Sequence, residues 1–191
     1  MQATAKTLRL VTAEPPGHES EVETLFRNHH DRVFRTAHRI TGSPADAEDV
    51  LQTVFLRLVK GHEEYDLSEN PAAFLSRAAI NASLDLMRSR TRARLVEPGD
   101  VELERLESRW QNPEAEHADR ELQTLIRQAV AGLGKTAGEM FVLRYYEGYD
   151  NQEIAKMLDT SQMVVGVVLH RARTRLRKEI GHFLEKHHEK Q

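Results

Sequence analysis

Apolar residues recur at intervals of three and four along most of this chain, and this spacing places them on one face of an α-helix. The first series starts after Ser20 and stops at Gly42, and its members are Val22, Leu25, Phe26, Val33, Phe34, Ala37 and Ile40. The chain before residue 19 lacks this period and contains two prolines and a glycine, so residues 1–18 are predicted to form a flexible arm.

Two further helix starts are each marked by a capping residue and a proline. Ser43-Pro44-Ala45-Asp46 supplies an N-cap serine, a proline in the first turn and an acid three residues after the cap, so a helix is predicted to run to Lys60. Asn70-Pro71 repeats this start signal. The third helix then carries an apolar stripe of Phe74, Leu75, Ala78, Ala79, Ala82 and Leu86. We therefore predict a helical domain over residues 19–94.

An acidic stretch with weak periodicity separates this domain from the rest of the chain. Because it contains two prolines and a glycine, residues 95–118 are predicted to form a linker, with room for a short helix around Leu103 to Trp110. A second helical domain is expected over residues 119–185, followed by a tail over residues 186–191. Its first helix carries Leu122, Leu125, Ile126 and Val130 on one face.

Two capping boxes mark helices in the second domain. Thr136 with Glu139 predicts the start of one helix, which ends at Gly148. Asp150 with Glu153 opens a short helix after it. Because no segment of useful length alternates between apolar and polar residues, we predict an all-α fold made of two small helical domains.

The end of the second domain has the spacing of a helix-turn-helix motif. A short helix around Ile154 is followed by the turn Asp159-Thr160-Ser161 and by a long helix from about Gln162 to at least Phe183. The residues expected to face the core are Val165, Leu169, Ala172 and Leu176. The residues left for phosphates or base edges are His170, Arg171, Arg173, Thr174 and Arg175. A helical hairpin in a bundle is the alternative interpretation of this segment alone.

Charge is segregated along the chain, although the formal net charge is only −3. Arginines gather between residues 77 and 94 and again between residues 171 and 178, whereas acids gather in residues 46–69 and 97–119. Two basic segments separated by an acidic one suggest two nucleic-acid contacts joined by a connector. Solvated helix faces are the alternative for any single run of charge.

The composition argues against several classes of protein. With 39% hydrophobic and 30% charged residues over 191 positions, the chain fits a soluble helical protein. No apolar run approaches the roughly 20 residues of a bilayer span and the first residues do not make a secretory signal, so a cytoplasmic protein is expected. No catalytic motif stands out, so neither an enzyme nor a cofactor is expected. With no cysteine, and with His29-His30 and His187-His188 pointing in different directions, no metal site is expected.

The helix over residues 46–58 has a polar face opposite its apolar stripe. The stripe consists of Val50, Leu51, Val54, Phe55 and Leu58. The polar face consists of Asp46, Asp49, Gln52, Thr53 and Arg57. Because an acid-rich surface repels DNA, this face is predicted to dock on a protein.

Three segments, in order, resemble the extracytoplasmic-function (ECF) class of bacterial RNA polymerase sigma factors. LFRNHHDRVFRTAHRITGSPADAEDVLQTVFLRLVK is similar to the first part of sigma region two, and ENPAAFLSRAAINASLDLMRSRTRAR is similar to its promoter-melting part. LRYYEGYDNQEIAKMLDTSQMVVGVVLHRARTRLRK is similar to region four. The resemblance spans residues 25–184. It implies a subunit that binds core polymerase, recognises the minus-ten and minus-thirty-five promoter elements and helps to open the DNA.

The resemblance also implies a role for each candidate surface. The residues implied in docking on the clamp of the largest polymerase subunit are Asp46, Asp49, Gln52, Thr53 and Arg57. Those implied in capturing unstacked minus-ten bases are Tyr65, Phe74, Arg77, Asn81 and Arg88. Those implied in contacting the minus-thirty-five element are Arg144, Asn151, Gln152, His170, Arg171 and Arg173. Region four would also lie on the flap of the second-largest subunit.

The resemblance further implies how such a subunit is placed and controlled. The acidic linker would thread toward the RNA exit path. An anti-sigma factor is expected as an inhibitory partner, and no small-molecule substrate is expected. The active protein would be found on the nucleoid.

One segment departs from the family pattern. Where the recognition helix of such factors offers small and polar or basic residues, this chain has Met163-Val164-Val165-Gly166-Val167-Val168. Apolar side chains cannot make bidentate hydrogen bonds to bases, so we expect this stretch to serve mainly in packing or nonspecific groove contact. The residues expected to turn at least partly outward are Val164, Val167 and Val168. They could pack against another helix or an inhibitor, which is the interpretation we favour here, they could contact thymine methyl groups, or they could be an apolar patch without a partner.

Two other functions fit parts of the pattern. A free-standing helix-turn-helix regulator, dimerised by its N-terminal helices, predicts specific duplex binding without polymerase and a palindromic site. A helical adaptor that binds only protein predicts no salt-dependent affinity for DNA.

Overall fold

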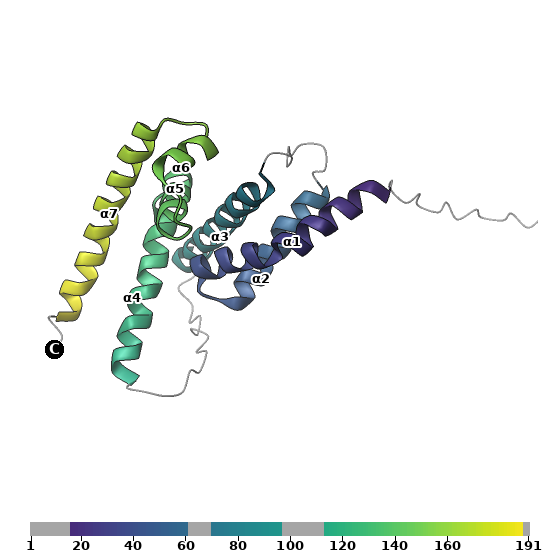
Figure 1. The fold of residues 1–191 in the computed structure, drawn as a ribbon. Coiled ribbons are helices and arrows are strands. Elements are labelled where there is room, and N and C mark those ends of the chain that lie inside the picture. Colours follow the sequence, from purple (N-terminus) through teal and green to yellow (C-terminus); the bar gives the residue numbers. More distant parts are fainter. Residues whose placement is uncertain (1–15, 61–69, 97–112, 189–191) are drawn as a thin grey trace, which may run out of the picture.

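The computed structural model describes residues 16–60, 70–96 and 113–188, and these residues form seven helices and no strand (Figure 1). The predicted all-α fold is therefore confirmed for the described part of the chain. The loop that contains Tyr65 and the predicted linker helix, Leu103 to Trp110, lie outside the described residues.

The first three helices form a bundle with its own apolar core. They are α1 (Pro16–Thr41), α2 (Pro44–Lys60) and α3 (Pro71–Val96), and each packs against the other two. The core contains Val33, Ala37, Val50, Val54, Leu58, Leu75 and Ala79, all almost completely buried. The predicted caps at the starts of α2 and α3 are confirmed. The backbone N–H of Asp46 donates to Ser43 Oγ at 3.3 Å, and that of Ala73 donates to Asn70 Oδ1 at 3.0 Å.

The last four helices form the second bundle and include the predicted helix-turn-helix. They are α4 (Pro113–Gly132), α5 (Lys135–Tyr145), α6 (Asn151–Met157) and α7 (Gln162–His188). The predicted capping box at α6 is confirmed, because Asp150 accepts the N–H of Glu153 and the Glu153 carboxylate accepts the N–H of Asp150. Among residues 162–181 of α7, whose burial the structure describes, the buried residues are the four predicted from the helical period, Val165, Leu169, Ala172 and Leu176.

The capping box predicted from Thr136 and Glu139 is wrong. Helix α5 begins at Lys135, directly after Gly134, whose φ of 91° lies in the left-handed region, and no side chain caps this start. The carboxylate of Glu139 instead accepts a hydrogen bond from Arg77 of the other domain. A local motif was therefore displaced by a partner that lies far away in the sequence.

Two helices begin earlier than their periodicity indicates. Helix α1 begins at Pro16 and α4 at Pro113, whereas the apolar pattern places these starts near Ser20 and Asp119. Proline is favoured in the first turn of a helix because its missing N–H would lack an intrahelical partner there. Both early turns precede the first residue of the apolar series read from the sequence, which is why hydrophobic periodicity does not detect them.

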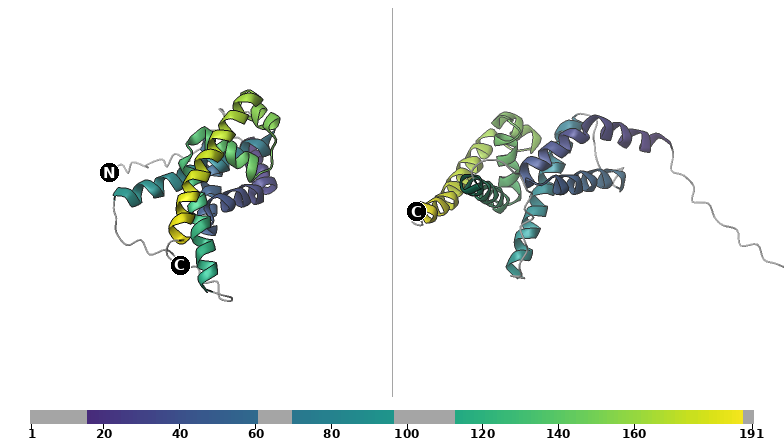
Figure 2. Two further views of the ribbon diagram at one scale, coloured as in Figure 1. Left: turned by 90° about the vertical axis from the view of Figure 1, so that its left-hand side faces the viewer. Right: turned by 90° about the horizontal axis from the view of Figure 1, so that it is seen from below.

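The two bundles lie side by side, and α3 lies between its own bundle and the second one (Figures 1 and 2). Helix α3 packs on α1 and α2 and also on α4 and α5. Ile80 and Leu84 of α3, both fully buried, belong to the same apolar cluster as Met140 and Leu143 of α5. The core of the second bundle therefore extends across the boundary between the domains.

Gly166 is a stability defect in the interior of α7. A Cβ atom added there would have its nearest neighbour, Asn151 Nδ2, at 4.0 Å, so alanine fits without displacing a neighbour. We expect Gly166→Ala to raise the free energy of unfolding by about 0.5–1 kcal/mol, because glycine loses more backbone entropy in a helix. Urea unfolding followed by circular dichroism measures this change.

Gly138 in α5 supplies the control for this prediction. A Cβ at Gly138 would lie 3.1 Å from Leu84 Cδ1 and 3.4 Å from the carbonyl oxygen of Val130. Gly138→Ala should therefore give no comparable stabilisation. Equal stabilisation by the two substitutions would contradict the packing described here.

Candidate nucleic-acid and protein interfaces

The polar face predicted on α2 is only partly a surface. The carboxylate of Asp46 is 6% exposed and accepts hydrogen bonds from both terminal nitrogens of Arg90 on α3. Asp49, Gln52 and Arg57 are exposed, and Thr53 is half-buried. Asp46 therefore joins α2 to α3, whereas Asp49 and Gln52 remain available to a partner.

Two apolar residues that the sequence analysis did not single out belong to this surface. Leu56 is 54% exposed and Val59 is 53% exposed, and they follow Asp49 and Gln52 by seven residues each. Seven residues are about two helical turns, so all four side chains share one face of α2. We call these four residues the α2 docking face. Exposed apolar groups next to an acid are typical of a protein contact rather than a DNA contact.

Arg77, an arginine that the resemblance assigns to promoter DNA, is held by the second domain. Arg77 Nε donates to Glu139 Oε1 at 2.8 Å, and its Nη1 donates to the carbonyl oxygen of Met157 at 2.7 Å. Glu139 is 5% exposed, so the pair is largely shielded from solvent on the carboxylate side. Ion pairs in such surroundings are sensitive to the loss of either partner.

Arg88, which lies further along α3, is also held by the second domain. Its Nε donates to the carbonyl oxygen of Ala131 at 2.9 Å, and its Nη1 donates to Asp85 Oδ1 at 2.8 Å. Between the two arginines, Leu84 approaches the backbone of α5 at Gly138, where a Cβ would be only 3.1 Å from its Cδ1. We call this set of contacts, from Arg77 through Leu84 to Arg88 with their partners in α4 to α6, the interdomain seam.

Helix α1 adds a second strip of polar contacts between the domains. Thr36 Oγ1 donates to Glu147 Oε1 at 3.0 Å, and Arg39 Nη1 donates to the carbonyl oxygen of Tyr146 at 2.8 Å. Burial raises the pKa of the Tyr146 phenol above its ordinary value of 10.0, although the positive charge of Arg127 partly opposes this shift. The phenol of Tyr146 is therefore neutral at physiological pH.

Two further residues predicted at the minus-ten site, Phe74 and Asn81, lie on α3 of the first bundle. Phe74 is half-buried and packs against the core of that bundle. Asn81 is half-buried, and its buried Oδ1 has no hydrogen-bond partner among the described residues. Tyr65 lies outside those residues. The structure thus places Arg77, Asn81 and Arg88 on α3. The two arginines are not free, because each donates hydrogen bonds to the second domain.

The residues predicted at the minus-thirty-five site lie on three helices of the second domain. Arg144 on α5 is exposed, and its Nη1 donates to the carbonyl oxygen of Tyr149 at 3.0 Å. Asn151 and Gln152 occupy the first turn of α6, where Gln152 is exposed and Asn151 is half-buried. The exposed members on α7 are His170, Arg171 and Arg173.

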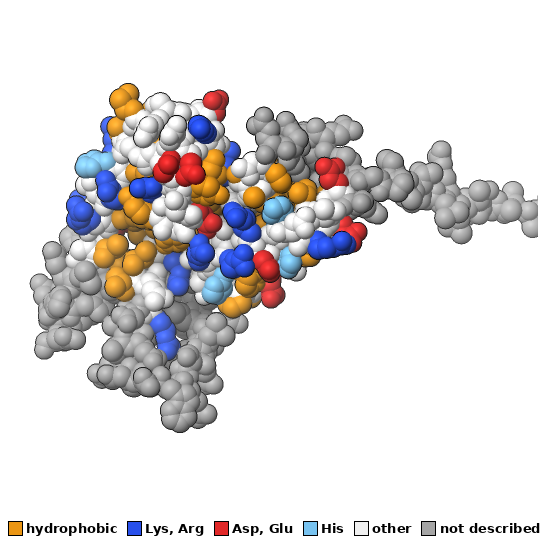
Figure 3. Space-filling model, in the orientation of Figure 1, with side chains coloured by type: hydrophobic (Ala, Val, Ile, Leu, Met, Phe, Trp, Pro, Cys, Tyr) orange, Lys and Arg blue, Asp and Glu red, His pale blue; other side chains and the backbone are white. Residues whose placement is uncertain are grey.

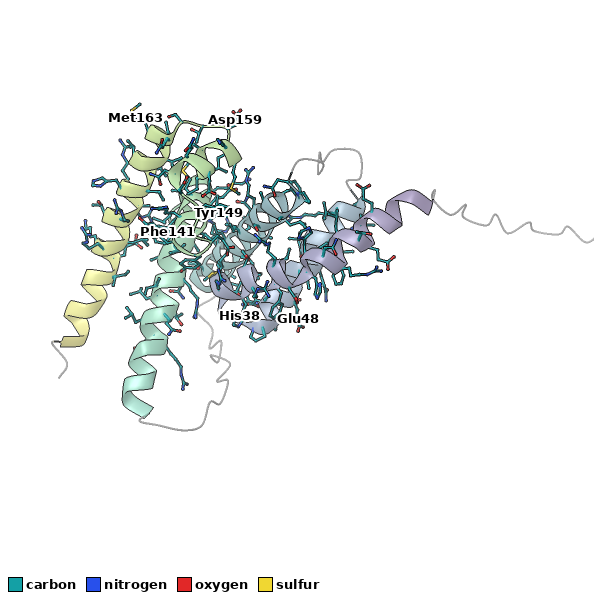
Figure 4. The ribbon with its side chains drawn as sticks, viewed as in Figure 1. His38, Glu48, Phe141, Tyr149, Asp159 and Met163 are labelled. Atoms are coloured by element: carbon teal, nitrogen blue, oxygen red, sulfur yellow. The ribbon has the colours of Figure 1, made fainter. Side chains whose placement is uncertain are left out.

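Helix α7 presents these cations along one edge of the molecule. Figure 3 shows lysine, arginine and histidine side chains along the edge where α7 runs, with an apolar group at its upper end. In Figure 4, Met163 marks that end and points away from the body of the domain, in which Phe141 and Tyr149 lie. A helix-turn-helix with an exposed basic second helix is the arrangement that contacts phosphates in a major groove.

Two negative observations apply to the described residues alone. No three histidine, aspartate or glutamate side chains among them are arranged to hold a metal ion. None of the helices in residues 16–60, 70–96 and 113–188 has both the length and the apolar character needed to cross a bilayer.

Two protein-family models match this chain. The model described as Sigma-70 region 2 matches residues 25–93, which comprise most of the first bundle. The model described as Sigma-70, region 4 matches residues 123–176, which include the helix-turn-helix.

Curated relatives align over most of the chain. The RNA polymerase sigma-E factor of Streptomyces coelicolor is 33% identical over 165 residues, which cover 86% of this chain and 88% of that protein. The ECF RNA polymerase sigma factor SigE of Mycolicibacterium smegmatis is 32% identical over 168 residues. That match covers 86% of this chain but only 62% of the SigE sequence, so SigE extends beyond the shared part.

Two solved structures share the fold at low sequence identity. One is the sigma factor RpoE in complex with the anti-sigma factor NepR from Bartonella quintana, with a TM-score of 0.50, 19% identity and coverage of 85% of this chain and 98% of that chain. The other is CnrH in complex with the cytosolic domain of CnrY, with a TM-score of 0.50, 20% identity and coverage of 85% and 88%.

Proposed function

Because this chain belongs to the ECF sigma factors of bacterial RNA polymerase, we propose that it binds core polymerase, directs it to a set of promoters and assists their opening. The observation that carries this proposal is the pairing of a region-2 bundle with a region-4 helix-turn-helix in one short chain. Neither a free-standing regulator nor a protein-only adaptor needs both regions in this order. The chain contributes binding surfaces rather than catalysis.

The α2 docking face is the surface that we assign to the polymerase clamp. Asp49 and Gln52 offer polar groups for hydrogen bonds. Leu56 and Val59 offer exposed apolar surface that a partner protein would remove from water. Region 4 would lie on the flap of the second-largest subunit, with α6 and α7 against the minus-thirty-five element. The acidic part of the predicted linker that precedes α4, residues 97–112, would follow the RNA exit path between these two anchor points.

The promoter-binding form differs from the closed arrangement described above. Arg77 and Arg88 donate hydrogen bonds to the second domain, and a phosphate or base would compete for the same guanidinium groups. We therefore assign the interdomain seam to an idle form of the chain. Opening of the seam would release α3 toward the minus-ten strand, whereas the cations of α7 are exposed already in the closed arrangement.

A protein inhibitor is the second partner that we propose. The two structural neighbours were solved in complexes with NepR and with the cytosolic domain of CnrY, of which NepR is described as an anti-sigma factor. An inhibitor of this kind would cover the α2 docking face or hold the seam. Co-purification of the chain from native cells tests this idea, and it fails if the chain emerges only as free protein or bound to polymerase.

Run-off transcription tests the main proposal. Core polymerase that lacks any sigma factor is mixed with this chain and with fragments of the genome of the source organism. We expect a small set of chain-dependent transcripts, each preceded by a shared pair of promoter elements. The absence of such transcripts over a range of salt concentrations would overturn the proposal.

A binding assay without polymerase separates this function from the alternatives. A free-standing regulator would bind one duplex specifically and would protect a palindromic site. A protein-only adaptor would bind no DNA in a salt-dependent way. The sigma factor instead requires core polymerase for tight and specific binding of promoter DNA.

A further inference from the structure

The first two turns of α7 expose an apolar tip on an otherwise basic helix. Met163 is 77% exposed, Val164 is 43% exposed and Val167 is 45% exposed. Val165 is fully buried, and Val168 is half-buried and packs against the core of the second domain. We call Met163, Val164 and Val167 the recognition tip. Val168, which the sequence analysis expected to turn outward with them, belongs mainly to the core.

Packing within the chain does not account for the recognition tip. Helix α7 packs on α4, α5 and α6 through the opposite face, which carries Val165 and Leu169. The side chains of Val164 and Val167 are therefore open to solvent even when the two domains are packed together. An apolar surface that remains open to solvent in this way indicates contact with another molecule.

The charges around the recognition tip indicate which molecule this is. The exposed cationic side chains that follow it along α7 are His170 when protonated, Arg171, Arg173, Arg175, Arg177 and Lys178. Between residues 170 and 179 of α7 the one acidic side chain is Glu179, which pairs with Arg175. A surface with an apolar end and a row of cations complements duplex DNA, whose phosphates flank a groove that contains thymine methyl groups.

The position of the tip in the motif determines what it reaches. In a helix-turn-helix the N-terminal residues of the second helix contact base edges, while the first helix crosses the DNA backbone. Valine has neither a donor nor an acceptor, so it cannot recognise guanine, cytosine or adenine by hydrogen bonds. The group that it complements in the major groove is the C5 methyl group of thymine.

We propose that Val164 and Val167 determine promoter specificity by contacting thymine methyl groups of the minus-thirty-five element, with Met163 packing beside them. This inference rests on the proposed function, because it assigns a specificity to the same helix. The cations farther along α7 then supply affinity without sequence preference. Base discrimination comes from apolar contact rather than from an arginine that contacts guanine.

Replacing thymine by uracil tests this proposal because the exchange removes only the methyl group. Polymerase carrying the full chain is bound, at one fixed salt concentration, to a promoter recovered in the run-off experiment. Each thymine of its minus-thirty-five element is replaced by uracil in turn. We expect the affinity to fall by about fourfold to tenfold at one or two positions, the loss of one buried methyl contact or slightly more.

Variants of the chain link this loss to the recognition tip. With Val164→Ser and Val167→Ser, thymine and uracil promoters should bind equally, because the variant side chains no longer favour the methyl group. Both residues are exposed, so the fold should persist, and circular dichroism checks the helical content. Arg173→Ala is the matched control on the same helix. It should weaken thymine and uracil promoters by the same factor and should reduce the dependence on salt.

The possible outcomes separate this inference from the proposed function. Uracil tolerated at every position, while transcription stays promoter-specific, would overturn the thymine contact and leave the sigma factor function intact. A uracil penalty that persists in the serine variants would also overturn it, because another residue would then read the methyl group. If the serine variants lose an inhibitor or another protein instead, without changing the base preference, the tip is a protein contact and the inference is wrong. Absence of any chain-dependent transcript would overturn both.

Discussion

Reversing the charge of Glu139 should separate the two domains, and reversing Arg77 as well should bring them partly back together. In Glu139→Arg, Arg77 faces a second cation at a position that is 5% exposed, and this costs about 3 kcal/mol, the low end for a broken buried pair. Arg77→Glu with Glu139→Arg rebuilds an ion pair but not the bond to Met157. Small-angle X-ray scattering should report the largest radius of gyration for the single variant, with the double variant between it and the unaltered chain.

The ion pair between Arg175 and Glu179 is the matched control. It has the same N···O distance of 2.8 Å, but it lies on the surface within α7. Reversing Glu179 should cost about 0.5 kcal/mol or less and should leave the radius of gyration unchanged. Equal expansion in both variants would mean that added charge, rather than the seam, controls the distance between the domains.

Opening the seam should also change DNA binding in a direction that depends on the residue. Glu139→Gln removes the negative charge that holds the Arg77 guanidinium, so the free chain should bind a single-stranded minus-ten oligonucleotide more tightly. Arg77→Ala opens the same seam but removes the cation, so it should bind the oligonucleotide more weakly than Glu139→Gln does. Fluorescence anisotropy measures both affinities. Identical affinities for the two variants would show that Arg77 does not contact the strand.

Asp49→Lys should abolish most of the affinity for core polymerase. Asp49 is exposed at the N-terminal end of the α2 docking face, so the change places a cation where we expect a basic partner surface. The loss of such a charge contact is typically about 2 kcal/mol or more, which corresponds to roughly a 30-fold weaker complex. Leu56→Ser should weaken the complex as well, through the apolar part of the same face. Both affinities are measured with purified core polymerase.

Two controls distinguish docking from folding. Glu21→Lys makes the same change of charge at an exposed position on α1 and should leave the affinity for polymerase unaltered. Asp46→Asn should lower the free energy of unfolding because it weakens the buried contact with Arg90, although Asp46 lies one turn from Asp49. Unchanged polymerase binding in both Asp49→Lys and Leu56→Ser would remove the α2 docking face from the proposed contact.

The sequence by itself determined the features that depend on neighbouring residues along the chain. The caps at Ser43, Asn70 and Asp150 depend on hydrogen bonds to backbone N–H groups two or three residues later in the chain. The residue types at these positions therefore predict them. The buried face of α7 follows from a period of 3.6 residues per turn in the same way. The order of the helices, the all-α class and the helix-turn-helix all rest on such local rules.

Side chains that contact more than one helix required the tertiary structure. Asp46 and Asp49 look equivalent in the sequence, but Arg90 lies next to only one of them, so one is buried and the other is exposed. Glu139 has the spacing of a capping acid and instead pairs with Arg77, which is 62 residues away. Periodicity describes the faces of one helix and does not identify the neighbour that covers each face.

The outward residues were also decided by neighbours from other helices. Leu56 and Val59 are apolar and would be assigned to a core by composition, yet no described helix covers them sufficiently to bury them. Val167 and Val168 are neighbours in the chain, but Val168 packs against the core of the second domain and Val167 is exposed. Sequence therefore determined which helices form and which residue types they carry. Only the packing of α3 against the other helices of its own bundle and against the second bundle decided which arginines and acids are held inside the protein. The others remain available to polymerase and DNA, because burial depends on contacts between segments far apart in the chain.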